Sequence, residues 1–190
     1  MDFFVIIYNI DTEPIITEVK YMHSFKEINP LELENAMKLI GSDWMLITAS
    51  NQDKVNTMTA SWGSLGVLWR KNVCTVYIRP QRYTYEFVEA SDKLSLSFFD
   101  ESYRSALNFC GSHSGRDCDK FAETGLTPTT VNGTPIIAEA KLVLICKKLY
   151  ADDIKRENFI SDEPLYTYEK NDFHRFYICE IEKALLKVDN

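Results

Sequence analysis

A series of strand-like segments, interrupted by short helical ones, is the feature that most constrains the fold of this chain. Segments rich in β-branched and aromatic residues cover 44–50, 54–64, 73–79, 94–99, 135–151 and 173–188. In 94–99, Leu94, Leu96 and Phe98 point to one side of the expected strand, and the intervening serines point to the other. Strands and helices do not alternate regularly and no GxGxxG motif is present, which disfavours a doubly wound parallel sheet. The chain therefore predicts a mainly β fold with short helices, whose antiparallel strands close into a barrel because closure removes exposed sheet edges.

The first short helix is expected over 29–41. Asn29 suits its N-cap, Pro30 suits the first helical position, and Glu32 completes a capping box. Gly41 suits the residue that ends the helix.

Three further helices are expected in the connections between strands. Thr84 suits the N-cap of a helix over 85–91. The other two are expected over 101–110, closed by Gly111, and over 115–124, closed by Gly125.

Composition limits the class of protein. The chain has 190 residues, of which 45% are hydrophobic, enough for one domain with a substantial core. Lys and Arg number 21 against 28 Asp and Glu, and the net charge of -7 argues against a nucleic-acid binder. The five cysteines form no CxxC pair and no HExxH motif is present. Reduced thiols in the cytoplasm are therefore expected, and no metal site is predicted.

The N-terminal run MDFFVIIYNI is apolar but short, lacks a basic region, and is followed by acidic residues. It is neither a convincing signal peptide nor long enough to cross a bilayer, so no membrane association is expected. We expect residues 1–22 to be an appendage and residues 23–190 to form the domain.

The stretch YIRPQRYTYEF, residues 77–87, gathers positive charge and a hydroxyl group in an acidic chain. Arg79 ends a predicted strand, Arg82 follows in the turn, and Thr84 stands at a predicted helix start. Helix starts present unpaired N–H groups, arginine forks match phosphate oxygens, and a threonine hydroxyl adds a donor. These residues suit a phosphate. Taken alone, however, the segment favours a solvent-facing turn in which Arg82 pairs with Glu86.

A second stretch, NTMTASWGSLG at 56–66, carries small and hydroxyl-bearing residues where a strand usually carries bulky ones. Such a strand lets a flat ligand lie against the backbone, whose N–H and C=O groups can read its polar edge. The isoalloxazine ring of a flavin has such an edge, and Trp62 can cover an aromatic face. An ordinary strand with Trp62 in the core explains the stretch as well.

Two weaker signals follow later in the chain. In GSHSGRDCDKF, residues 111–121, Ser114 and Lys120 suit a further phosphate or ribityl contact, and also suit a helix-capping loop with surface charges. His113 is expected at the surface. His174 begins the last predicted strand, where a histidine can orient a substrate or donate a proton, although a lone histidine is more often structural.

The order of these motifs resembles the flavin reductase-like, FMN-binding split-barrel family, and most of all its flavoredoxin-type members. The segments that carry the resemblance are WMLITA, VNTMTASWGSLGVLW, RPQRYTYEF, LSFF, ALNFCGSHSGRDCDKF and FHRFYICEIE. It runs from Phe25 to Ile181. The resemblance implies a six-stranded antiparallel Greek-key split barrel, a homodimer, and FMN bound without a covalent link at the subunit interface.

The resemblance also implies roles for individual residues. Thr59, Ala60, Ser61 and Trp62 would line the flavin ring, Arg79, Arg82 and Thr84 would hold the phosphate, and Ser114 and Lys120 would approach the cofactor. The full expected cofactor-binding set is Asn56, Thr57, Met58, Thr59, Ala60, Ser61, Trp62, Arg79, Arg82, Tyr83, Thr84, Ser114 and Lys120. His174 matches a late histidine near the nicotinamide side and is the candidate catalytic residue. It follows Asp172-Phe173 instead of the Gly-Asp of many reductases, so nicotinamide use is less firmly implied than FMN.

The resulting hypothesis is an FMN-dependent oxidoreductase. Two activities fit it: an NAD(P)H-dependent flavin or ferric reductase, and a flavoredoxin-like carrier that exchanges electrons with a redox protein. Either would need no nucleophilic side chain, and none is indicated, because no GxSxG elbow is present. A non-catalytic flavin-binding redox sensor is the alternative, with Cys110 and Cys118 flanking the expected site. The third hypothesis is an unrelated small barrel with a structural role.

Overall fold

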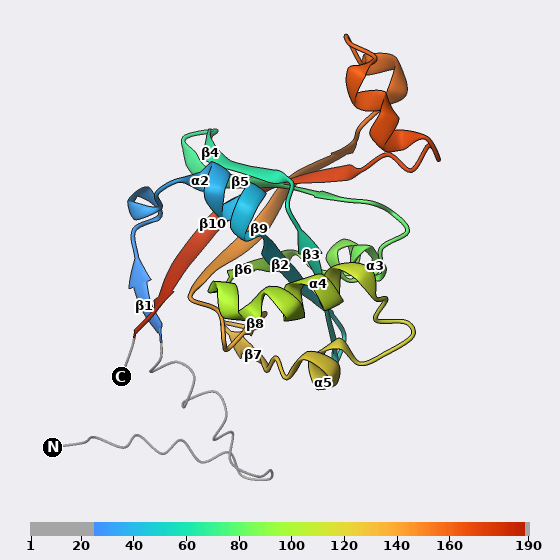
Figure 1. Cartoon of the computed structure of the whole chain (residues 1–190). Helices are drawn as coiled ribbons and strands as arrows, with labels where there is room; N and C mark the ends of the chain where they lie inside the picture. Colours follow the sequence, from blue (N-terminus) through green and yellow to red (C-terminus); the bar gives the residue numbers. More distant parts are fainter. Residues whose placement is uncertain (1–24, 189–190) are drawn as a thin grey trace, which may run out of the picture.

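The computed structural model describes residues 25–188 (Figure 1). The appendage expected over 1–22 lies outside these residues, and the division at residue 22 stays a prediction. None of the helices within the described range is long and apolar enough to cross a membrane.

The main sheet is antiparallel throughout and contains eight strands, not the six expected. Its strands are β1 (Phe25–Ile28), β2 (Met45–Asn51), β3 (Lys54–Ala60), β4 (Gly63–Leu68), β5 (Lys71–Ile78), β6 (Lys93–Phe98), β9 (Leu142–Asp153) and β10 (Arg175–Lys187). They are ordered β3-β2-β6-β9-β10-β5-β4, and β1 pairs with β10. The mainly β fold with short helices and the split-barrel class are confirmed.

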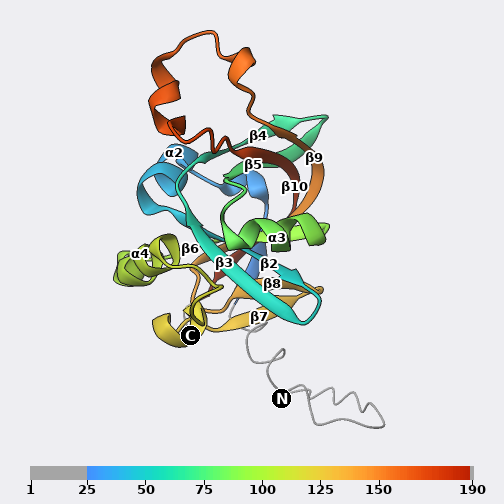
Figure 2. The same cartoon turned by 90° about the vertical axis from the view of Figure 1, so that its right-hand side faces the viewer.

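The barrel is split between β3 and β4, which stand at the two ends of the strand order. These two strands follow one another in the chain, and Figure 2 shows β3 leading upward into β4. The single strand expected over 54–64 is therefore wrong, because Ser61 and Trp62 interrupt it. Gly63 is needed at the start of β4, since a Cβ there would lie 2.7 Å from the carbonyl oxygen of Thr75.

The core has two parts, one on each face of the sheet. On β2, Met45 and Ile47 belong to the cluster inside the barrel, whereas Leu46 packs outside it. On β6, the apolar residues of the expected alternation point into the inner cluster, and Ser95 on the other face donates to the carbonyl oxygen of Pro135, at 2.6 Å. The outer cluster lies under helix α4 (Arg104–Ser112) and the hairpin of β7 (Pro128–Val131) and β8 (Thr134–Ile137).

The helix expected over 29–41 is two short pieces. Asn29 and Glu32 do form the capping box, but it opens only a 3-10 turn, Pro30–Glu32. Asn35 then adopts a left-handed conformation, with φ of 51°, and caps α2 (Ala36–Lys38). The chain continues as a π-helical turn over Leu39–Asp43, so Gly41 does not end the helix.

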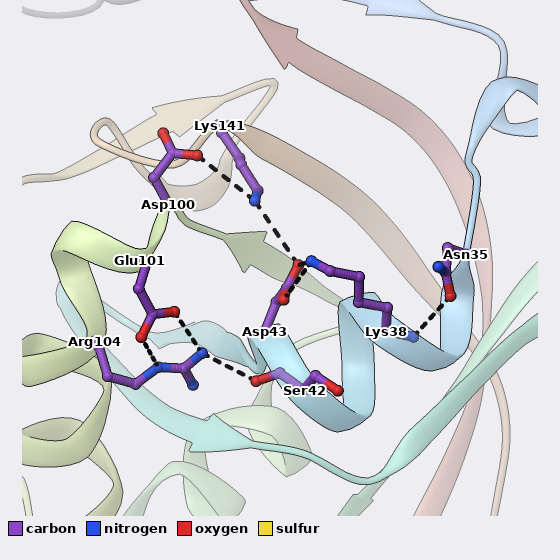
Figure 3. Close-up of polar contacts among 8 residues, drawn as sticks. All are labelled: Asn35, Lys38, Ser42, Asp43, Asp100, Glu101, Arg104 and Lys141. Atoms are coloured by element: carbon purple, nitrogen blue, oxygen red, sulfur yellow. Dashed lines mark hydrogen bonds and ion pairs between the residues drawn. The ribbon is translucent and has the colours of Figure 1, made fainter.

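A charge network fastens this segment to the barrel (Figure 3). Lys38 Nζ lies 2.7 Å from Asp43, and Lys141, just before β9, lies 3.9 Å from the same carboxylate. From the other side, Arg104 at the start of α4 donates to the carbonyl oxygen of Ser42, at 3.0 Å. The segment therefore contacts both the sheet and α4.

The other helices also differ from expectation at their ends. Helix α3 spans Tyr83–Ala90 with Arg82 at the N-cap, so Thr84 lies inside the helix and is not its cap. Gly111 lies within α4, which continues to Ser112, so Gly111 does not end this helix. Helix α5 is short, Lys120–Thr124, and Gly125 ends it in the left-handed conformation, with φ of 70°.

The last two strands, β9 and β10, form the long hairpin of the barrel. The single segment expected over 135–151 is divided between β8 and β9. Register shifts along β10 mark bulges, which help the strand coil around the barrel. We call residues 154–174, between β9 and β10, the arm. It contains 3-10 turns over Arg156–Asn158 and Glu163–Tyr168. Figures 1 and 2 both show the arm standing out from the barrel beyond the ends of its two strands.

Candidate functional site

Two neighbouring cavities lie where β3 ends and the turn after β5 begins. The first, which we call the strand cavity, has a volume of about 280 Å³. It is lined by Met58, Thr59, Ala60, Ser61, Trp62, Tyr77, Arg79, Arg82 and His174. The second, the turn cavity, has a volume of about 200 Å³ and is lined by Gln81, Arg82, Tyr83, Thr84, Ser112, His113, Ser114 and Lys120. Arg82 belongs to both, so the two cavities adjoin.

The structure brings most of the residues singled out from the sequence to these two cavities. Asn56 and Thr57 are the exceptions, because both are buried in β3 and line neither cavity. Sequence reasoning missed Tyr77, two residues before Arg79, and Gln81, between the two arginines, because neither has a charge or an unusual pattern to mark it. His113, expected only at the surface, is exposed and also lines the turn cavity.

The threonine hydroxyls of β3 are occupied by the fold. Thr57 donates to the carbonyl oxygen of Ile47 at 3.1 Å and lies 2.9 Å from the hydroxyl of Thr48. Thr59 donates to the carbonyl oxygen of Leu107 on α4. Since β3 pairs only with β2 among the described strands, part of its outer backbone edge has no strand partner. A ligand in the strand cavity would therefore meet backbone groups of β3 more readily than its threonine hydroxyls.

Arg82 is held by backbone carbonyls and not by a carboxylate. Its guanidinium donates to the carbonyl oxygens of Gly111, at 2.7 Å, and Cys110, at 3.3 Å. Burial lowers the pKa of Arg82 below its usual range. The alternative pairing with Glu86 does not occur, because Glu86 forms its ion pair with Arg116.

Lys120 is a second desolvated cation beside Arg82. Its side chain is buried, with 4% of the residue exposed, and Nζ donates to the carbonyl oxygens of Thr57 and Cys110, both at 2.9 Å. Burial lowers the pKa of Lys120 to about 8. Within residues 25–188, neither Lys120 nor Arg82 has a carboxylate in ion-pair contact. Burial disfavours the charged forms of Lys120 and Arg82, and an anion in the turn cavity would stabilise them.

Thr84 presents its hydroxyl at the first turn of α3. The hydroxyl is buried and accepts a hydrogen bond from the amide nitrogen of Asn56, at 2.9 Å. The same Asn56 amide is packed against Gly115, where a Cβ would overlap it. Asn56 thus positions both Thr84 and the loop that carries Ser114, although it lines neither cavity itself.

His174 closes the strand cavity on the side of the arm. Its ring lies 4.9 Å from that of Trp62, and its Nδ1 is 3.0 Å from the hydroxyl of Tyr168. Burial, with a smaller effect from the charge of Arg79, lowers the pKa of His174 to about 4. The imidazole is therefore neutral at pH 7 and has one N–H to donate and one nitrogen to accept.

Arg79 lies in the strand cavity and apart from the turn cavity that contains Thr84 and Lys120. Its guanidinium forms an ion pair with Asp172 and donates to the carbonyl oxygen of Thr167, at 2.9 Å. The side chain also lies over the ring of Tyr168, with 5.5 Å to the centroid. Arg79 therefore ties the arm to the end of β5.

All five cysteines are free thiols, and Cys118 is the one that is not fully buried. Burial raises the pKa of Cys110 to about 11, so its thiol is protonated at neutral pH. Cys110 meets the site through its backbone carbonyl, which accepts from Lys120 and Arg82.

The fold and the two adjoining cavities define a split-barrel protein with a two-part candidate site at the end of β3. The family model of the flavin reductase like domain matches residues 37–188, and the chain belongs to this family. A relative from Aeropyrum pernix, described as an uncharacterized protein, is 32% identical over 99 residues. That match covers 50% of this chain and 37% of the relative, so the chain spans little more than a third of the relative's length.

Solved structures share the fold. An FMN-binding domain of a flavin reductases-like enzyme from Shewanella baltica aligns with a TM-score of 0.64 and 19% identity, over 86% of this chain and 77% of that one. Flavoredoxin of Desulfovibrio vulgaris aligns with a TM-score of 0.61 and 21% identity, over the same shares of the two chains.

Proposed function

We propose that this protein is an FMN-binding oxidoreductase. The observation that carries the proposal is the pair of desolvated cations, Arg82 and Lys120, that face a small cavity and have no carboxylate partner among residues 25–188. The phosphate of FMN would supply the missing negative charge, and the first turn of α3 adds unpaired N–H groups beside it. Membership of the flavin reductase-like family supports the same ligand.

In this proposal the two cavities divide the cofactor between them. The isoalloxazine ring occupies the strand cavity, against the backbone of Thr59, Ala60 and Ser61, with Trp62 near one edge. The phosphate occupies the turn cavity, where Arg82, Thr84, Ser114 and Lys120 converge and Tyr83 lines the wall. Arg79, assigned to the phosphate by family resemblance, lines the ring-side cavity instead and remains tied to Asp172. We therefore propose that Arg79 acts on the ring side and on the arm.

FMN would supply the redox chemistry, since the flavin accepts a hydride and passes electrons on singly or in pairs. The chain's own residues would position the ring, balance its phosphate and control access. His174 is neutral and adjoins the ring-side cavity, so it would act as a hydrogen-bonding group there and not as a fixed positive charge.

Within this function we propose either an NAD(P)H-dependent flavin or ferric reductase or a flavoredoxin-like electron carrier. Anaerobic addition of NADH or NADPH to the FMN-loaded protein separates them. Bleaching of the flavin spectrum within seconds, with turnover when free flavin or ferric iron is added, supports the reductase. Bleaching by a reduced redox protein alone supports the carrier. A tightly held flavin that neither donor reduces would support the redox sensor.

We further propose a homodimer and a cytoplasmic location. Exposed apolar residues along β4 and the turn after it, among them Val67 and Trp69, support a second copy at that edge. The free thiols support a reducing compartment.

The phosphate assignment is tested by FMN titration of Arg82→Gln and Thr84→Val. Each removes a contact worth about 1–3 kcal/mol when the acceptor is charged, so affinity should fall roughly ten- to a hundredfold. Arg156→Gln on the arm is the matched control and should bind FMN as the wild type does. Circular dichroism and thermal melting confirm that the variants fold. Unchanged FMN affinity in both site variants would remove the assignment.

A further inference from the structure

A third cavity lies between the arm and the mouth of the strand cavity. Its volume is about 930 Å³, within the range of sites that take small organic molecules. Apolar and aromatic side chains form much of its wall, among them Trp62, Phe159, Ile160, Tyr166 and Phe176. We call it the arm cavity.

The arm cavity is continuous with the proposed flavin site. Trp62 lines both the arm cavity and the strand cavity. Tyr168, which also lines the arm cavity, is in contact with His174 of the strand cavity through its hydroxyl. A molecule in the arm cavity would therefore lie against the residues that border the flavin ring.

The arm is braced and presents a defined wall. Tyr168 is buried, with its ring 4.7 Å from that of Phe173 and 6.1 Å from that of Phe159. Arg79 holds the base of the arm through Asp172 and the carbonyl oxygen of Thr167. Ile160 and Tyr166, by contrast, are 105% and 74% exposed, so these side chains are free to contact a ligand.

The charges on the cavity wall decide which ligand fits. Three carboxylates, Asp152, Asp153 and Glu163, line it against the single amine of Lys155. Lys155 is already paired with Asp152, at 3.2 Å, and the nearby Arg175 is paired with Asp153, at 3.0 Å. A dinucleotide would bring a negatively charged pyrophosphate into this cavity. Both nearby cations are already paired with carboxylates, so the pyrophosphate would have no free cation to bind. A neutral or cationic ligand would meet no such penalty.

We propose that the arm cavity binds an uncharged, apolar aromatic electron acceptor of the quinone type, and not an anionic dinucleotide. This inference rests on the proposed function, because the flavin next to the cavity is the electron source. In the reaction two electrons and two protons pass from the reduced flavin to the quinone, which leaves oxidised flavin and a hydroquinone. A dinucleotide donor, if one is used, would have to reach the flavin by another route.

The test measures binding, so that it can be read without turnover. Menadione, which is neutral, is compared with 1,4-naphthoquinone-2-sulfonate, which carries one negative charge on a similar ring, and with NADH. Binding is followed by saturation-transfer NMR and by titration of tryptophan fluorescence, on the full chain with and without added FMN. We expect menadione to bind at least tenfold more tightly than either anion.

Substitutions in the wall of the arm cavity show whether menadione binds there. Ile160→Asp and Tyr166→Asp should each weaken menadione binding about tenfold, since they place a charge on the exposed apolar wall. Leu31→Asp is the matched control, because Leu31 is an exposed leucine, 75% accessible, in the N-terminal 3-10 turn. It should leave menadione binding unchanged. FMN affinity should stay the same in all three variants.

Each contrary result has a distinct meaning. Equal or tighter binding of the sulfonate or NADH, or menadione binding that survives both arm variants, overturns the proposal. If Ile160→Asp instead converts a dimer into a monomer and leaves menadione binding intact, a second copy occupies the cavity and the proposal fails. If the wild type binds menadione as expected but no FMN, the cavity assignment stands and the proposed flavin function fails.

Discussion

His174 shows how one side chain can report on the environment of the whole site. It is 8% exposed, lies against Trp62 and is bonded to Tyr168. Burial disfavours its charged form, and the positive charge of Arg79 adds to this effect. At this position the histidine acts as a neutral, oriented hydrogen-bonding group.

The depressed pKa of His174 predicts a pH dependence of stability. The pKa is 6.5 when unfolded and about 4 when folded, so between these values the unfolded state binds more protons. The free energy of unfolding is therefore intact above pH 6.5 and is lost as the pH falls toward 4. At pH 5 the loss from this group is on the order of 2 kcal/mol relative to pH 7.

Urea denaturation of the wild type and of His174→Gln at pH 7 and pH 5 measures this loss. The variant should lack most of the extra destabilisation at pH 5, whatever its stability at pH 7. His113→Gln is the control, since that histidine is exposed. A wild type and a His174→Gln variant that lose the same free energy between the two pH values would contradict the assignment.

Single residues also show how far sequence reasoning reaches. Arg82 was identifiable because a cation at a strand-to-helix turn of an acidic chain is a local, visible signal. Thr84 was placed near the site but assigned the wrong local role, as an N-cap. Its hydroxyl instead accepts from Asn56, 28 positions away in the sequence, and no local pattern encodes that partner. Tyr77 was missed because a tyrosine is an ordinary residue in a strand and nothing around it indicates a site.

At the scale of elements, predictions were most accurate where periodicity alone decides the structure. The strand over 94–99 matches β6 closely, since its alternation serves two buried faces. The helix over 29–41 was wrong despite a correct capping box. Asn35 supplies a second cap after Leu33 and Glu34, and the helix restarts there. The π-helical turn that follows is tied to Lys141 and to Arg104 of α4, and such tertiary contacts leave no local signal in the sequence.

The turn between β4 and β5 contains two adjacent residues in the left-handed conformation. Trp69 and Arg70, with φ of 51° and 59°, form the two-residue loop that joins Leu68 to Lys71. Hairpin loops of this type favour Asn and Gly because a side chain with a Cβ is strained there. The native turn therefore stores strain at an exposed site.

Arg70→Gly should relieve part of this strain and stabilise the protein by roughly 0.5–1 kcal/mol. Arg70→Ala removes the same side chain but keeps a Cβ, so it should not give this gain. Thermal or urea denaturation of the three proteins measures the difference. Equal stability of the Gly and Ala variants would show that the backbone conformation at residue 70 carries no cost.

At the scale of the whole molecule, the opening of the barrel creates both the site and an exposed edge. The strand cavity lies beside the end of β3, and β4 forms the other end of the strand order. Among the described strands β4 pairs only with β5. The strand carries Val67, 71% exposed, and the turn after it carries Trp69, 54% exposed. Exposed edges of this kind are normally covered or charged.

The proposed homodimer covers this edge with a second copy. Light scattering after size exclusion should therefore give about twice the chain mass of 22.0 kDa. Val67→Lys places a charge on the edge strand and should shift the protein toward the monomer, with a dissociation constant that rises at least tenfold. Leu31→Lys is the control, because Leu31 is similarly exposed but belongs to the 3-10 turn Pro30–Glu32 and not to β4 or its turn, and it should leave the dimer intact. A wild type that stays monomeric at 100 µM would contradict the dimer. If Val67→Lys leaves the dimer intact, the second copy lies on a different face of the protein. FMN titration of that variant would then show whether the site is complete within one chain.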